Sequence, residues 1–188
     1  MTTTTVTTTT ASAADRIQRC EEYIHRPRTP YLARKARYDA ACHLLFSARA
    51  RISNDDILAD VGAGMAELDM CLRVDYGWRG RYVPVDGWLD GTDLETWTPP
   101  RPFDWFACLE VLEHLRDPDR LVTAMQAHAT RGLVITTPNP EVWDVLSMDP
   151  THVTPISRTM LHDWGFTTTL HTFYGKYQDG IAGLWTRE

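Results

Sequence analysis

The stretch ILADVGAG, residues 57–64, decides the fold of this chain. An apolar run leads into Asp60, glycines follow at Gly62 and Gly64, and residues 66–72 can begin a helix. A strand, a tight glycine turn and a helix start bring backbone amides up to a nucleotide-like ligand. A Cβ atom at either glycine would block the turn or the approach of the ligand. The stretch therefore predicts an α/β protein with a ligand site at this turn.

Further strand-like segments follow the glycine turn. Apolar runs near 81–85, 103–109 and 133–137 alternate with helical or loop-like segments, which is typical of a parallel sheet with crossover connections. The segments 166–174 and 181–187 alternate in polarity around a glycine and predict a hairpin. Helices are expected at 65–74, at 117–129 after the cap residue Asp117, and from Ser157 to about Gly165.

The N-terminal part of the chain differs in composition from the rest. Residues 1–14 are rich in threonine and offer too little apolar surface to offset the entropy of ordering. A helix is expected at 15–26 and a longer one, with a basic face, at 31–51. The chain is thus expected to divide into a disordered tail (1–14) and a single domain (15–188), composed of an N-terminal helical cap (15–52) and an α/β core (53–188).

Charge and composition narrow the classes of partner. The chain has a net charge of −6, so it has no overall attraction to nucleic acid or to an anionic membrane. Its 4 cysteines show no Cys-x-x-Cys spacing, which disfavours a zinc site or a redox pair. No apolar run approaches the roughly 20 residues of a membrane span, and no secretory signal is visible. We expect a soluble, cytoplasmic protein.

Five segments, taken in order, resemble the class I S-adenosylmethionine-dependent methyltransferases. Residues 60–64 resemble the first motif, 82–86 the second strand and 92–95 the stretch that brackets the adenine. The segment FDWFACLEVLEHL, 103–115, is similar to the type 11/23 subgroup, which includes ubiquinone-pathway O-methyltransferases, and 132–139 resembles the fifth strand. The resemblance implies a Rossmann-like fold: a mostly parallel twisted sheet, helices on both faces and an antiparallel last strand.

The resemblance also implies S-adenosylmethionine as the cofactor and assigns residues to it. Gly62 and Gly64 would let the backbone approach the methionine part, and Asp60 would lie toward the amino end. Asp86, at the tip of the second strand, would accept hydrogen bonds from both ribose hydroxyls.

Four more residues complete the expected cofactor site. Asp93 would accept from the adenine amino group with Leu94 against the ring, although an aspartate here could equally be a turn residue. Leu109 and Glu110, at the end of the strand near 103–109, would face the cofactor and the reacting centre. Since only six residues separate Asp86 from Asp93, the helix that relatives place there is either lost or reduced to a turn, and the next strand is rudimentary.

Two histidines are candidates for the methyl acceptor side. His114 follows the strand near 103–109, and His152 follows the strand near 133–137. Both loops leave the carboxyl edge of a parallel sheet, where ligands bind in such folds. With an ordinary pKa near 6.5, either ring could act as the general base. The alternative for His114 is a structural hydrogen bond at a helix end.

Acidic neighbours raise the question of a metal. If residues 110–115 were helical, Glu110, Glu113 and His114 would share one face. A similar pattern with a distant histidine binds a divalent metal in the small-RNA terminal 2′-O-methyltransferases. Because Glu-His at this place is common in relatives without a catalytic metal, we expect no metal here.

The sequence favours methyl transfer from S-adenosylmethionine to an oxygen, or as second choice a nitrogen, of a small-molecule acceptor. One alternative is a nucleic-acid methyltransferase that acts on an RNA terminus; the chain has no clustered basic residues near the site to favour it. Another is a methyltransferase-like binding module without catalysis. The acceptor and the oligomeric state stay open.

Overall fold

The computed structural model describes residues 31–188, so the expected tail at 1–14 and helix at 15–26 lie outside the described residues. The strands are β1 Ile57–Val61, β2 Arg81–Val85, β3 Phe103–Leu109, β4 Ala129–Pro138, β5 Thr167–His171 and β6 Gly180–Thr186. The helices are α2 Tyr31–Leu45, α3 Glu67–Val74, α4 Gly87–Asp90, α5 Pro118–His128, α6 Val145–Met148, α7 Arg158–Asp163 and the 3₁₀ helix η1 Leu112–His114.

The strands form one sheet in the order β2-β1-β3-β4-β6-β5. The first four pair in parallel, and β6 is antiparallel to both β4 and β5. The expected strands, the final hairpin and the antiparallel last strand are therefore confirmed. Between Asp86 and Phe103 the chain forms one helical turn, α4, and no strand.

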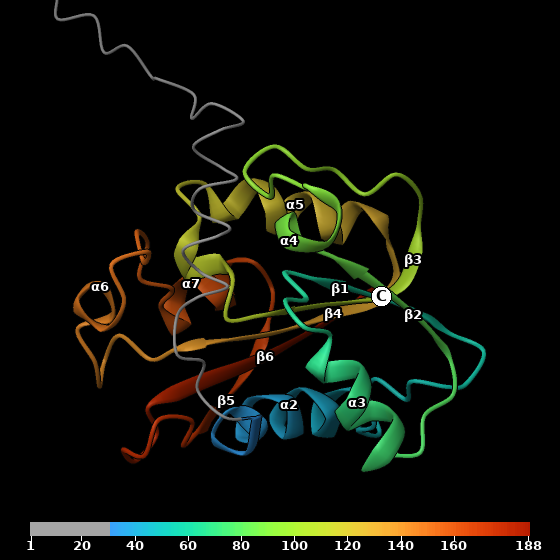
Figure 1. The fold of residues 1–188 in the computed structure, drawn as a ribbon, viewed down its shortest axis with the longest axis horizontal. Helices are drawn as coiled ribbons and strands as arrows, with labels where there is room; N and C mark the ends of the chain where they lie inside the picture. The colour runs from blue at the N-terminus through green and yellow to red at the C-terminus, as the bar shows by residue number, and fades with distance from the viewer. Residues whose placement is uncertain (1–30) are drawn as a thin grey trace, which may run out of the picture.

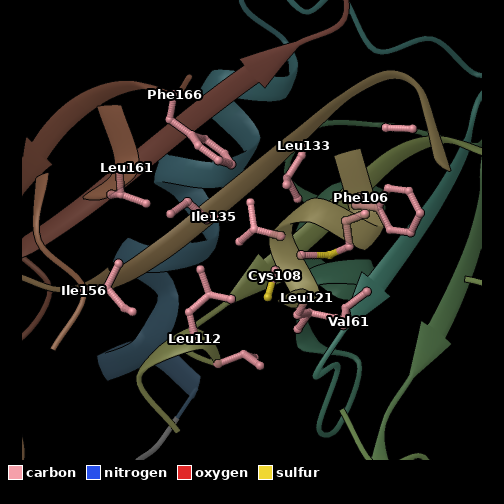
Figure 2. Close-up of a cluster of buried hydrophobic side chains, with 14 of the residues drawn as sticks. Val61, Phe106, Cys108, Leu112, Leu121, Leu133, Ile135, Ile156, Leu161 and Phe166 are labelled. Atoms are coloured by element: carbon pink, nitrogen blue, oxygen red, sulfur yellow. The ribbon is translucent and has the colours of Figure 1, made fainter. Parts of the chain in front are cut away.

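Helices cover both faces of the sheet: α2 and α3 lie on one face and α5 on the other (Figure 1). The side chains of β3 alternate accordingly. Phe106 and Cys108 belong to the cluster on the α5 side, whereas Trp105 and Ala107 belong to the cluster on the α2 and α3 side. Figure 2 shows the first cluster, which the buried strands and the helices α5 and α7 build together. Because successive side chains point to opposite faces and both faces are covered, β3 is apolar along its length, and the strand could be recognised as a continuous apolar run.

Helix α2 is shorter than the expected 31–51 but is an integral part of the core. Its buried residues Ala41, Cys42 and Leu45 pack into the cluster beneath β1 and β3. The helix ends at Leu45, whose carbonyl accepts from the Ile52 amide at 2.9 Å after a turn. Within the described residues no helix is long and apolar enough to cross a membrane.

The expected helix caps are present. The side chain of Asp117 accepts from the Arg120 amide at 3.1 Å, and Pro118 occupies the first turn of α5. Ser157 caps α7 by accepting from the Met160 amide at 3.2 Å. Both caps fix the direction in which the chain leaves the carboxyl edge of the sheet.

Candidate functional site

The glycine turn after β1 combines two glycines with different constraints. The Gly62 amide donates to the Val85 carbonyl at 2.8 Å, and its φ is 79°. A Cβ atom at Gly62 would lie 2.2 Å from Cγ2 of Val111, so the packing of the protein itself requires this glycine. Gly64 has a φ of 53°, yet an added Cβ would meet no other described group within 4 Å. Gly64 therefore leaves open space beside the turn.

Asp86 ties the second strand to this turn. Its carboxylate is 6% exposed, and Oδ2 accepts from the Gly64 amide at 2.8 Å. Ala66, where the glycine pattern has its third position, keeps a left-handed φ of 57° at the start of α3. The Ala66 amide donates to the Ala63 carbonyl at 2.8 Å, so the turn holds this conformation without a glycine.

Asp60 is a buried acid beneath the turn. It lies on β1, and the hydroxyl of Tyr82 on β2 donates to its Oδ2. Burial raises the pKa of Asp60 to about 7, although the hydrogen bond from Tyr82 acts in the opposite direction. Asp60 can therefore change its charge near neutral pH. Sequence reasoning did not identify Tyr82 as part of the site. The only indication in the sequence was its position in the second predicted strand.

Asp93 and Leu94 lie in the short segment between α4 and β3. The Glu95 amide donates to Asp93 Oδ1 at 3.1 Å, which is the geometry of an aspartate turn. Leu94 packs against the core cluster on the α5 side, and its carbonyl accepts from Arg120 Nη2 at 2.9 Å. The segment is thus anchored to α5.

Leu109 and Glu110 end β3, as expected, but Glu110 departs from the expected helix. Its φ is 57°, and η1 covers only Leu112–His114. A helix over residues 110–115, the condition under which Glu110, Glu113 and His114 would share one face, is therefore not formed. Glu110 follows the strand in a left-handed conformation.

The Glu110 carboxylate is directed toward α2 and the loop between β5 and β6. The Tyr174 hydroxyl donates to Oε2, and Arg37 Nη1 lies 3.7 Å from the same oxygen. The guanidinium of Arg37 also lies 4.7 Å from the centre of the Tyr174 ring. Burial raises the pKa of Glu110, with Arg37 opposing the rise. Sequence reasoning missed Arg37 and Tyr174, because neither belongs to a recognisable motif.

A buried aspartate places Tyr174. Asp179 is fully buried, and its Oδ2 accepts from the amides of Tyr174 at 3.0 Å and Lys176 at 2.6 Å. Asn139 joins this loop to the end of β4, since its Nδ2 donates to the Gln178 carbonyl at 2.8 Å. The loop that carries Tyr174 is therefore fixed to the carboxyl edge of the sheet.

The structure brings His114 and His152 together. The Glu113 carbonyl accepts from the amides of Val153 at 2.8 Å and Thr154 at 3.1 Å, which joins the loop after β4 to η1. The two imidazole rings meet edge to face with centroids 4.7 Å apart. Burial lowers the pKa of His114, and the neighbouring His152 lowers it further. An imidazole without a proton on one nitrogen can accept a proton or bind a cation there.

Glu113 completes this group. The side chain is fully buried, and Oε2 is 3.4 Å from the Thr137 hydroxyl on β4. Burial raises its pKa well above the ordinary range, and Glu110 raises it further. One ligand atom each from Glu113, His114 and His152 lies within 4.8 Å of the others. The site thus has two parts: a glycine turn with Asp60 and Asp86, and an acid-histidine group at the adjacent strand ends.

Neither a protein-family model nor a curated protein matches this chain. Solved structures do match its fold. A methyltransferase from Aquifex aeolicus, described as dependent on S-adenosylmethionine, has a TM-score of 0.55 at 16% identity and covers 90% of this chain and 97% of its own. The complex of DhpI with S-adenosylhomocysteine has a TM-score of 0.57 at 14% identity and covers 93% of both chains.

A third match is the plantazolicin methyltransferase BpumL, in complex with a desmethyl analogue and S-adenosylhomocysteine. Its TM-score is 0.57 at 8% identity, and it covers 90% of both chains. At such identities these likenesses establish the fold. The chain has the Rossmann-like fold of the class I methyltransferases.

Proposed function

We propose that this protein transfers a methyl group from S-adenosylmethionine to an oxygen of a small-molecule acceptor. The observation that carries the proposal is the connection between Gly64 and Asp86 at the carboxyl edge of β1 and β2. It places a buried carboxylate beside a glycine turn with open space, in the order that a nucleoside cofactor requires. Several solved structures of this fold hold S-adenosylmethionine or S-adenosylhomocysteine, which supports this choice of cofactor.

The cofactor would bind across the first part of the site. Gly62 and Gly64 would border its methionine part, Asp86 would accept from the ribose hydroxyls, and Asp93 with Leu94 would border the adenine. Leu109 and Glu110 would face the cofactor through the backbone at the end of β3. Asp60 would lie toward the ammonium group, which an ionised carboxylate attracts.

The acceptor would bind beside His114 and His152. They lie in the segments that follow β3 and β4, two neighbouring strands of the sheet, and their rings are in contact. Transfer is an in-line displacement, so the protein must hold the acceptor oxygen and the methyl carbon in line and promote loss of the acceptor proton. The type 11/23 subgroup, with its ubiquinone-pathway O-methyltransferases, is the nearest parallel that the motif at 103–115 suggests.

Methyl transfer can be tested directly with radiolabelled S-adenosylmethionine. The protein is incubated with small-molecule and RNA fractions from an extract of its source, in the presence of divalent cations. We expect label in the small-molecule fraction, and its release by treatments that cleave methyl ethers or esters would identify an oxygen acceptor. Label confined to RNA would instead support the RNA-terminus alternative, and no label in any fraction would support a non-catalytic module.

Cofactor affinity should depend on pH through Asp60. Its pKa in the folded protein is about 7, so the carboxylate is mostly protonated at pH 6 and mostly ionised at pH 8. If the ionised form binds the cofactor ammonium, the dissociation constant of S-adenosylhomocysteine should fall by up to about tenfold over this interval. Calorimetry at several pH values measures this, and Asp60→Asn should flatten the dependence.

The stability of the free protein should change in the opposite direction. The pKa of Asp60 rises from 3.8 to about 7 on folding, so between these values the folded state holds a proton that the unfolded state has lost. This contribution therefore decreases as pH rises from about 4 to 7 and is constant above that. An affinity that is equal at pH 6 and pH 8 would remove Asp60 from the cofactor site.

A further inference from the structure

The acid-histidine group has the features of a cation site. Glu113 is fully buried, and its Oε1 has no hydrogen-bond partner among residues 31–188. A buried carboxylate oxygen without a partner is costly unless a cation or a donor reaches it. The unpartnered oxygen therefore indicates that a cationic group belongs here.

The hydrogen bonds of the two histidines fix which ring nitrogen is free. His152 Nδ1 lies 2.7 Å from the Val145 carbonyl, which can only accept, so this nitrogen carries the proton. His114 Nδ1 lies 3.3 Å from the Thr151 carbonyl and 2.9 Å from the Thr151 hydroxyl. That hydroxyl donates to Asp149 Oδ1 at 2.6 Å, so it accepts from His114. Both rings thus keep an Nε2 lone pair, in the arrangement that orients metal-binding histidines.

We propose that Glu113, His114 and His152 bind a divalent transition-metal cation. Their ligand atoms lie within 4.8 Å of one another, and two imidazoles with one carboxylate suit Zn²⁺, Mn²⁺, Fe²⁺ or Co²⁺ better than Mg²⁺ or Ca²⁺. Glu110 is not part of the set, because Tyr174 and Arg37 contact its Oε2 and the group of ligand atoms within 4.8 Å does not include it. The proposal replaces the expectation of a metal-free site, which rested on sequence alone.

Within residues 31–188 a second group of possible metal ligands consists of Asp39, Cys71 and Asp75. We do not propose a metal site there. The ammonium of Lys35 lies 2.5 Å from Asp39 and 3.1 Å from Asp75, so a cation already joins the two carboxylates. This group provides an internal comparison, because a metal held by Cys71 would have a thiolate ligand and one held by Glu113 would not.

The inference rests on the proposed function for its chemical consequence. Three protein ligands leave open positions on the cation, where the oxygen of the acceptor can bind. Coordination lowers the pKa of an acceptor hydroxyl, whose proton passes to solvent. The oxygen then forms a bond to the methyl carbon, the carbon–sulfur bond breaks, and sulfur keeps the electron pair as S-adenosylhomocysteine. The acceptor class is therefore a hydroxyl compound, and an adjacent second oxygen would strengthen binding by chelation.

The test is a Co²⁺ titration of the chelator-treated full-length protein, followed by visible absorption and calorimetry. We expect one ion per chain, d–d bands of nitrogen and oxygen ligands, and no thiolate charge-transfer band. Glu113→Gln and His152→Ala should each weaken Co²⁺ binding by about 100-fold or more, and Thr151→Val, which frees His114 to rotate, by about tenfold. His162→Ala should bind Co²⁺ as the wild type does.

Each outcome decides the inference. A thiolate band, no binding by the wild type, or equal affinity in His152→Ala and His162→Ala would overturn it. Zn²⁺ competition confirms the class of ion. S-adenosylhomocysteine binding to the metal-free protein is measured separately and shows that each variant is folded. If the wild type binds Co²⁺ but not S-adenosylhomocysteine, the proposed function is wrong and the metal site is still supported.

Discussion

Gly64→Ala is expected to weaken the binding of S-adenosylhomocysteine by about 5- to 150-fold, the effect of about 1–3 kcal/mol that overpacking costs. The added methyl group would meet no described protein atom within 4 Å, so the protein has room for it. In the proposed complex that room holds the methionine part of the cofactor. The variant should therefore fold and lose affinity. Calorimetry with S-adenosylhomocysteine and thermal unfolding measure the two effects.

Gly77→Ala is the matched control for this prediction. Gly77 also has a left-handed φ, 68°, and an added Cβ there also meets nothing within 4 Å. Both variants should lose a similar amount of stability, about 1–2 kcal/mol, because alanine disfavours this conformation. Only Gly64→Ala should lose affinity. Wild-type affinity in Gly64→Ala, or the same loss in Gly77→Ala, would show that the cofactor does not bind at this turn.

His114→Ala and His152→Ala are each expected to lower turnover by about 10²–10⁴-fold, the usual range for promoting loss of the acceptor proton. In the proposed metal site both rings do this by holding the cation that lowers the pKa of the acceptor hydroxyl. The rings are 4.7 Å apart at the ends of η1 and the loop after β4, beside the proposed methyl group. The cofactor turn is formed by other residues, so S-adenosylhomocysteine affinity should stay near that of the wild type. Turnover is assayed with a divalent cation present, and affinity by calorimetry.

His162→Ala provides the comparison for the histidine variants. His162 lies on α7, where its Nε2 is 2.9 Å from the Thr168 hydroxyl, and has no part in the proposed site. It should retain turnover and affinity. If both site variants are fully active, or if they lose cofactor affinity and turnover in parallel, neither histidine acts at the acceptor.

Much of the fold could be predicted because the central strands β1, β3 and β4 are buried on both faces. A short, continuous apolar run such as 103–109 is typical of a buried strand in an α/β domain. The order of these apolar runs and the glycine turn limits the possible topologies. The six residues between Asp86 and Asp93 predicted that the helix there is either lost or reduced to a turn, and α4 is one turn long. The end of α2 at Leu45 was not predictable, because residues 46–51 contain neither the glycine nor the proline that usually marks a helix end.

The candidate site was predictable only in part. The topology placed His114 and His152 at one sheet edge, and the structure brings them together. The topology did not reveal that Tyr174 and Arg37 contact the Glu110 carboxylate, because this depends on the left-handed φ of Glu110 and on residues from distant parts of the chain. Nor could spacing show that carbonyl and hydroxyl oxygens leave Nε2 of both rings free.

The most direct test of the central claim is a calorimetric titration of the wild-type protein with S-adenosylhomocysteine, paired with thermal unfolding. We expect one binding site per chain and a rise in melting temperature that grows with ligand concentration, because binding to the folded state stabilises it by RT ln(1 + [L]/Kd). Absence of both heat and thermal shift at millimolar ligand would contradict the proposal that this protein uses S-adenosylmethionine.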